Sequence, residues 1–562
     1  MAALNLKLRP LFRNDGVAQA LDVTMVFDTA GKKQDEVVFN HTLMRAVVPT
    51  MQYTAESIQL TNSNNSAIGL YTVDTKRNTY REFRVEQDVP AGERLTVKYQ
   101  ATPRHVNEST RCGPQVAIEE ENGGLSGAGL AFLLIPATGD GDILHDIVIE
   151  WDLSSAPSTT RAVCTFGEGQ GVSVRERPSI LSECFFAAGP LKSYPPVVET
   201  TPSAPSATSL SPFGMYWLSD PPFDTSSLGQ QLEKLIPRMA DFFGDDDRLF
   251  RIFIRRNEYK CASGRGLHRG FVFAWTPLSP KAEDMVQDFL MHEIVHNWPR
   301  LGFTTGGPED LIDGWFNEGI AEYYSLILPF VFGVMTEEQF IERFNWRISG
   351  YYTNPDRAVK NKDVQDRFWL PGQVNRIPYQ RGFMYFVQLA YKLHNSGKRS
   401  LDELMREMIK LRATDKPHGI RVWLSFVERE LGSPALDDYK EMSEAKPIIL
   451  PSDVAKVWIP NSNWKLEPVR QEEFYLGFPE ENFSAQPRVI AGLDLESRAA
   501  KVGGLQEGDQ ITLKYGFLVD ADVWPKMFTM NVKRGNEETP HQITWWPRSW
   551  YKVESYQFVR SA

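Results

Sequence analysis

The sequence predicts a multidomain α+β protein with a β-sandwich-like N-terminal domain, a central part that mixes strands with helices, a helical subdomain and a C-terminal β domain. Three observations support this prediction. A chain of 562 residues exceeds what one hydrophobic core usually organises. Apolar residues alternate with period two near the start, and longer amphipathic stretches follow further along. With 42% hydrophobic and 24% charged residues, the composition is that of a folded protein and not of a disordered one.

Residues 1–194 are predicted to form the β-rich domain. Apolar residues alternate at Leu21, Val23, Met25 and Phe27, and the same pattern returns at 95–99 and 147–151. This alternation is typical of strands with one buried face. The segment 195–212 is rich in Pro, Ser and Thr, and we expect it to be an extended linker without a core of its own.

The centre of the chain changes to strands and helices. We expect a catalytic domain over 213–335, a helical subdomain over 336–464 and a C-terminal β domain over 465–562. Ser279 and Pro280 suit the start of a helix, because Ser caps free N–H groups and Pro fits the first turn. The predicted strands cover 250–254 and 270–275, and the predicted helices cover 228–243, 314–328, 382–395 and 401–412.

Charge and apolar patterning exclude several classes of partner. The formal net charge is -11 without a long basic run, which disfavours nucleic acid as a partner. No uncharged apolar stretch approaches the length of a membrane span, and the first residues lack a signal-peptide core. We therefore expect a cytoplasmic protein with no membrane segment.

The four cysteines are scattered, without the close pairs of a zinc knuckle or a disulfide scaffold. They are Cys112, Cys164, Cys184 and Cys261. A bridge between Cys164 and Cys184 stays open at this point.

The run MHEIVHNW contains an H-E-x-x-H motif. On a helix, His292 and His296 project from one face one turn apart, so that both can bind a single ion. Glu293 stands beside them, placed to take a proton from a metal-bound water without being a ligand. The alternative is an ordinary helix on which two histidines fall four apart by chance.

A catalytic zinc needs a third protein ligand and an open position. In the run GWFNEGIAEYY, Glu318 is the candidate ligand, and Glu322 lies one turn further on the same predicted face. Glu322 can accept a hydrogen bond from a ligand histidine and orient it. The alternative, two solvated surface acids, fits poorly with the apolar neighbours Trp315 and Phe316.

These residues resemble the gluzincin peptidases, the thermolysin-like class whose third zinc ligand is a glutamate. The matching residues are His292, Glu293, His296, Asn317, Glu318, Gly319 and Glu322. Within that class, EGIAEYY is most similar to the glycyl aminopeptidase family, whose members join a thermolysin-like catalytic domain to a PDZ domain. The resemblance implies one Zn²⁺ per chain, held by the two histidines and Glu318, and a peptide or protein substrate.

Two further segments fit this family. The run PYQRG resembles the Tyr-x-Lys-Gly element of gluzincin aminopeptidases, which implies that Tyr379 stabilises the oxyanion of the tetrahedral intermediate. A packing role is the alternative for this tyrosine. The runs YLGF at 475–478 and SRAAKVGGLQEGDQI at 497–511 resemble a PDZ domain, which implies a second peptide site. A degenerate domain kept for packing is equally open.

One segment departs from the family. A Gly-Leu-Glu-His-like segment of the relatives supplies the acid that holds the free amine of the substrate, and this chain has Gly266, Leu267, His268 and Arg269 instead. A cationic pair would repel an ammonium group, so aminopeptidase specificity is in doubt and internal cleavage becomes an alternative. We take His268, Arg269 and Gly270 as candidate substrate-binding residues, with 270–275 as a strand that pairs with extended substrate. His268 can instead satisfy a backbone group.

The sequence thus predicts a zinc metallopeptidase in which Glu293 is the base and Tyr379 stabilises the oxyanion. A catalytically silent, zinc-containing scaffold that binds peptides through the PDZ-like domain is the alternative from another class. A zinc hydrolase for a non-peptide substrate shares all the chemical residues. Another divalent metal in place of zinc also stays open.

Overall fold

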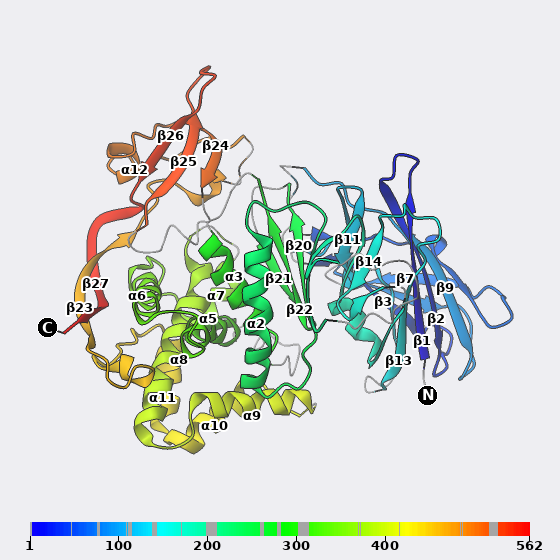
Figure 1. The fold of residues 1–562 in the computed structure, drawn as a ribbon, viewed down its shortest axis with the longest axis horizontal. Coiled ribbons are helices and arrows are strands. Elements are labelled where there is room, and N and C mark those ends of the chain that lie inside the picture. The colour runs from blue at the N-terminus through cyan, green and yellow to red at the C-terminus, as the bar shows by residue number, and fades with distance from the viewer. Residues whose placement is uncertain are drawn as a thin grey trace. The chain divides into compact units, whose positions relative to one another are not determined.

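The computed structural model describes residues 3–561 except for 46–47, 76–78, 108–109, 111–114, 138–142, 170, 198–210, 259–262, 278–282, 302–313, 369, 371, 415, 484, 486 and 516–525. The chain forms two compact units. The first comprises Met1–Pro237 and Asp247–Pro277, and the second comprises Arg238–Asp246 and Leu278–Ala562. Strands dominate the first unit and helices begin the second (Figure 1). The prediction of a multidomain α+β chain with a β-rich N-terminal region is confirmed.

Four main sheets build the first unit. The first has the order β16 (Gly171–Glu176), β13 (His145–Trp151), β1 (Ala3–Phe12), β2 (Ala18–Asp28), β9 (Arg94–Ala101) and β6 (Gln59–Thr61). The second has the order β10 (Glu119–Glu121), β11 (Gly124–Ala128), β17 (Phe185–Gly189), β14 (Arg161–Cys164) and β15 (Gly167–Glu168). The third has the order β12 (Ile135–Pro136), β3 (Val37–Thr42), β8 (Tyr80–Val85) and β7 (Leu70–Asp74). The fourth has the order β18 (Lys192–Tyr194), β19 (Phe213–Trp217), β20 (Phe250–Arg256), β22 (Gly270–Trp275) and β21 (Ser263–Leu267).

The first three sheets share one core. Val23 of the first sheet, Phe186 of the second and Phe83 of the third are all buried in the same cluster. The inward residues of β2 are the alternating apolar ones that predicted a strand there. Cys164 and Cys184 are buried in this core as free thiols, so the bridge that the sequence left open does not form.

The second sheet also packs on the fourth. Phe185 of β17 and Phe253 of β20 lie with ring centroids 4.8 Å apart, in a cluster that includes Tyr216 of β19. In the fourth sheet β19, β20 and β22 run parallel, and helix α2 (Thr225–Phe243) connects β19 to β20. Most of the predicted linker at 195–212 lies outside the described residues, and the domain boundaries stay predictions.

Helices begin the second unit, and each predicted helix there overlaps an observed one. They are α3 (Glu283–Val295), α5 (Gly314–Val331), α6 (Glu337–Thr353), α7 (Asn361–Arg367), α8 (Ile377–Ser396), α9 (Leu401–Ala413), α10 (Ile420–Leu431) and α11 (Pro434–Ser443). The predicted start of α3 at 279–280 lies outside the described residues. Helix α8 begins earlier than predicted, because Pro378 occupies its first turn, where a missing N–H costs nothing.

The C-terminal part has two β elements. Strands β23 (Trp464–Phe474) and β27 (Arg548–Arg560) form a long antiparallel ribbon against α6, where buried Gln471 accepts from Ser349 Oγ at 3.0 Å and Ser555 Oγ at 2.6 Å. Beyond the ribbon, β24 (Gln510–Tyr515), β25 (Phe528–Lys533) and β26 (His541–Trp545) form a small sheet with α12 (Arg498–Lys501) beside it (Figure 1). No described helix is both long and apolar enough to cross a membrane.

An ion pair inside the first unit yields a stability prediction. Arg255 Nη2 lies 2.9 Å from Glu119 Oε2, and both side chains are at most 5% exposed. Arg255→Met leaves the Glu119 carboxylate buried without its ion-pair partner, which we expect to lower the free energy of unfolding by about 3–5 kcal/mol. Urea unfolding followed by tryptophan fluorescence measures this loss.

Two variants serve as controls for this pair. Arg9→Met removes one partner of the exposed Arg9–Asp22 pair and should leave the free energy of unfolding almost unchanged. The double variant Glu119→Leu, Arg255→Met removes both buried charges and should recover most of the loss. A double variant as unstable as Arg255→Met alone would contradict the explanation by an unpaired charge.

Candidate active site

Helices α5 and α8 cross with their backbones in direct contact. A Cβ atom on Gly319 of α5 would lie 2.3 Å from Gly382 Cα, and one on Gly382 would lie 2.1 Å from Trp315 O. Only two glycines facing each other allow this approach. Glu318 and Tyr379 lie beside these glycines on their own helices, so the crossing sets the distance between them.

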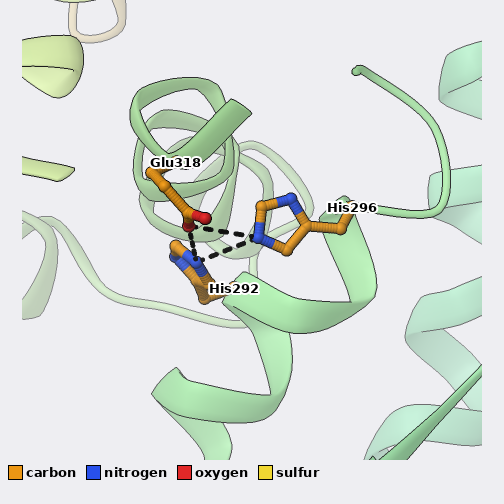
Figure 2. Close-up of side chains that lie close together, drawn as sticks. All are labelled: His292, His296 and Glu318. Atoms are coloured by element: carbon orange, nitrogen blue, oxygen red, sulfur yellow. Dashed lines mark hydrogen bonds and ion pairs between the residues drawn. The ribbon is translucent and has the colours of Figure 1, made fainter. Parts of the chain in front are cut away.

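Three candidate metal ligands converge at the end of α3 (Figure 2). His292 Nε2 lies 3.1 Å from Glu318 Oε2 and 3.2 Å from His296 Nε2, and His296 Nε2 lies 3.4 Å from Glu318 Oε2. A tetrahedral zinc with bonds of about 2.0–2.2 Å needs ligand atoms about 3.3–3.5 Å apart. The triangle of donors therefore fits this ion closely. His296 follows the last residue of α3 and is not within it.

The other ring nitrogen of His292, Nδ1, faces the carboxylate of Glu322. Nδ1 lies 3.0 Å from Glu322 Oε1, and Glu322 Oε2 accepts a hydrogen bond of 2.9 Å from Arg347 Nε on α6. A carboxylate this close to Nδ1 favours the proton on that nitrogen, so Nε2 keeps its lone pair for a metal. Arg347 also donates to Ser325 Oγ at 3.3 Å, so that α5 and α6 fix the carboxylate together.

The electrostatics of the site favour a bound cation. Burial would raise the pKa of Glu318, but His296 and His292 lower it below its usual range. The pKa of Glu322 falls to about 2, because Arg347 and His292 outweigh its burial. Burial alone would lower the pKa of His292, yet the adjacent carboxylates of Glu318 and Glu322, which accept from the imidazole, raise it to about 10. Two ionised carboxylates thus hold positive charge at the position where the donor atoms meet.

Glu293 and Tyr379 complete the site. Burial raises the pKa of the half-buried Glu293, although His296 and His292 oppose the shift. The ring of Tyr379 stacks on that of His292, with centroids 5.6 Å apart and an angle of 28° between the planes. Tyr379 lies in the first turn of α8 and not ahead of a helix, because α8 begins at Ile377.

Side chains outside the site hold its segments in place. Asn317, the residue before Glu318, accepts a hydrogen bond of 2.9 Å from Leu301 N through its Oδ1. Arg412 of α9 donates to Asn297 O and Trp298 O at 3.3 and 3.0 Å. The chain that leaves α3 is therefore tied to both α5 and α9.

The predicted substrate-binding residues belong to the first unit. His268 and Arg269 form the turn of the β21–β22 hairpin, with Arg269 at a φ of 44°. Arg269 Nε lies 3.0 Å from Asp247 Oδ2, and the backbone N–H of His268 donates to Glu183 O. The expectation that 270–275 pairs with substrate as an edge strand is wrong, because β22 lies between β20 and β21. The edge strand on this side of the sheet is β21.

Sequence reasoning missed Arg347 and the structural role of two glycines. Arg347 lies on another helix than Glu322, so no local spacing connects the two. Gly319 and Gly382 were matched to family motifs, but their role as a helix crossing needs the packed structure. The only local signal for this crossing is a glycine inside each of two apolar helical runs. Glycine disfavours helix interiors, so its presence there suggests a packing reason.

Comparison with known proteins identifies structural neighbours. The chain is similar to an aminopeptidase N family protein from Idiomarina loihiensis, with a TM-score of 0.62 and 12% identity over 100% of this chain and 98% of the other. It is also similar to an M1 zinc metallopeptidase from Deinococcus radiodurans (TM-score 0.47, 15% identity, 80% and 93% covered) and to leukotriene A4 hydrolase from Saccharomyces cerevisiae (TM-score 0.47, 14% identity, 78% and 67% covered). No known family profile and no curated protein matches the sequence. The first likeness shows a shared fold.

The glycine crossing leads to a prediction for the fold of the site. Gly319→Ala forces α5 and α8 apart, and we expect it to cost about 1–3 kcal/mol of stability and to weaken zinc binding. Thermal unfolding and chelator competition measure the two effects. Gly314→Ala on the same helix is the control, because a Cβ there meets no described atom within 4 Å. Equal behaviour of the two variants would refute the crossing as a constraint.

The support behind His292 leads to a second prediction. Glu322→Gln removes the charge that orients His292 and that pairs with Arg347, and it should weaken zinc binding about 10- to 100-fold. Competition against a chromophoric chelator measures the affinity. Glu444→Gln, which alters an exposed pair with Lys360, should leave it unchanged. If zinc affinity in Glu322→Gln equals that of the unaltered protein, the carboxylate has no such role.

Proposed function

We propose that the protein is a zinc-dependent metallopeptidase that hydrolyses peptide bonds. The observation that supports this most directly is the triangle of donor atoms from His292, His296 and Glu318, with edges of 3.1–3.4 Å. These three residues would hold zinc, which would supply a Lewis acid for the scissile carbonyl and for the attacking water. The shared fold with an aminopeptidase N family protein agrees with this function.

Glu293 is the proposed general base. It lies next to His292 in the chain, and no described side chain forms a hydrogen bond or ion pair with it. It can therefore accept the proton of the attacking water and pass it to the leaving amine. Burial raises the pKa of its carboxyl, which strengthens it as a proton acceptor toward the operating pH.

Tyr379 is the proposed donor to the oxyanion. Its ring is held against His292, which directs the residue to the position where the carbonyl oxygen becomes negative. Burial and the carboxylates of Glu318 and Glu293 raise the pKa of its hydroxyl well above the usual value. The hydroxyl therefore keeps its proton and donates a hydrogen bond.

We do not assign strict aminopeptidase specificity. The segment that holds an acid in the relatives forms here the turn of a hairpin, and its Arg269 is paired with Asp247. This segment offers no carboxylate to a free amine. We therefore include peptides without a free amino terminus among the proposed substrates.

A PDZ-like peptide site in the C-terminal module is a second proposed function. The backbone N–H groups of Leu476, Gly477 and Phe478 donate to no backbone acceptor in the described chain, and Gly477 has a φ of 93°. Successive free N–H groups around a left-handed glycine suit the carboxylate of a peptide. If the protein were a catalytically silent scaffold, this module alone would provide its peptide-binding function.

Cleavage of a mixed peptide library tests the proposed peptidase. Glu293→Gln keeps the three ligands but removes the base, so we expect zinc to stay bound while cleavage falls by at least about 100-fold. Mass spectrometry of the products and metal analysis give the two readouts. Glu342→Gln, an exposed change on α6, should cleave as the unaltered protein does.

Two other results would redirect the assignment. Zinc in both proteins with no cleavage in either would favour the peptide-binding scaffold. Cleavage that survives in Glu293→Gln would remove this residue from the mechanism.

A further inference from the structure

The turn before α8 places an arginine on the same helical face as Tyr379. The short 3-10 helix Val374–Arg376 runs directly into α8, and Arg376 has helical backbone angles, φ −84° and ψ −21°. Arg376 and Tyr379 are three residues apart, and side chains at this spacing are neighbours on a helix surface. Tyr379 stacks on His292, so that face is directed toward the candidate metal ligands.

Arg376 carries a charge that the described protein leaves without a partner. Its side chain is half-buried, and it forms no hydrogen bond or ion pair with any described residue. The other arginines of this region are all engaged. Arg381 donates to Asn361 and two backbone carbonyls, and Arg357 pairs with Glu473 at 2.6 Å. A half-buried guanidinium with no anion is unusual, because burying an unpaired charge costs free energy.

The charge of Arg376 reaches the candidate active site. The pKa of Tyr379 is raised by burial and by Glu318 and Glu293, and Arg376 acts against this rise. None of those carboxylates forms an ion pair with Arg376 among the described contacts. Arg376 therefore adds a positive potential at Tyr379.

The same turn holds a second unsatisfied group. Asn375 Oδ1 is buried and has no hydrogen-bond partner in the described chain. Buried polar atoms are nearly always hydrogen-bonded in folded proteins. Both groups are available to a bound peptide, in which a carboxylate can accept from the guanidinium and an N–H can donate to Asn375 Oδ1.

The chemistry of a guanidinium restricts that ligand. Its planar array of donors matches a carboxylate with two parallel hydrogen bonds. An unmodified peptide carries carboxylates only on acidic side chains and at its C-terminus.

We propose that Arg376 binds a carboxylate of the peptide substrate and makes the enzyme selective for peptides that carry one near the cleaved bond. This inference rests on the proposed peptidase function and adds a class of substrate to it. Arg376 is a specificity-determining residue here and takes no part in proton transfer.

Four versions of one cleaved peptide test the proposal. They carry Glu or Gln beside the cleaved bond, each with a C-terminal carboxylate or an amide. We expect the protein to prefer the versions with one of the two carboxylates, and Arg376→Gln to lower kcat/KM for those versions about 10-fold or more. The neutral versions should change little. Comparing the two kinds of carboxylate shows which source Arg376 recognises.

Two control variants separate specificity from general effects. Arg367→Gln removes an equal charge from an exposed pair with Asp356 and should keep the preference. Tyr379→Phe should slow all four peptides alike, because it acts on the chemical step. A uniform loss in Arg376→Gln, or no loss at all, would overturn the proposal.

Peptide-binding measurements test the role of Arg376 independently of catalysis. We would measure, by calorimetry, the affinity of the same four peptides for zinc-loaded Glu293→Gln and for the double variant with Arg376→Gln. Tighter binding of a carboxylate version that disappears in the double variant supports Arg376 even if the unaltered protein cleaves nothing. Absent binding, or binding that Arg376→Gln leaves unchanged, refutes the inference. The proposed peptidase activity is tested by the cleavage assay alone.

Discussion

The contact between Gly319 and Gly382 lets α5 and α8 cross backbone to backbone. Two groups of the candidate site, Glu318 and Tyr379, lie on the helices that cross here. Glu318 meets the two histidines from α5, and Tyr379 stacks on His292 from α8. A side chain at either glycine would separate the helices by the width of a methyl group, which is comparable with the tolerance of a metal site. The fold therefore trades helix propensity at these two positions for the geometry of the site.

Charge organises the same region in successive layers. The two histidines and Glu318 form the inner layer, and Glu322 supports His292 from behind. Arg347 then balances Glu322 from α6, at 2.9 Å. Glu318 and Glu322 each have a cationic or imidazole partner, which compensates for burial. The side chains of Glu293 and Arg376 have no ion-pair partner among the described residues. We assign Glu293 to the attacking water and Arg376 to the substrate.

The C-terminal ribbon is part of the framework that holds the helices. Gln471 of β23 joins Ser349 of α6 to Ser555 of β27 through buried hydrogen bonds, and α6 also carries Arg347. Gln373, at the turn before α8, donates to Glu480 of the module at 3.3 Å. The C-terminal module, for which we propose a peptide-binding role, is thus joined by hydrogen bonds to the part of the chain that carries the candidate site.

Local patterns in the sequence predicted strands β2, β9, β13, β20 and β22 of the first unit, helices α3, α5, α8 and α9 of the second, and the grouping of His292, Glu293 and His296. These features depend on spacings of two or four residues along one element. Only the tertiary structure decided how α5 and α8 approach, which cation supports Glu322, and that the strand at 270–275 is internal. It also placed Tyr379 in the first turn of α8, where Arg376 becomes its neighbour. These contacts join segments that are far apart in the chain, so they exist only once the helices and sheets have packed.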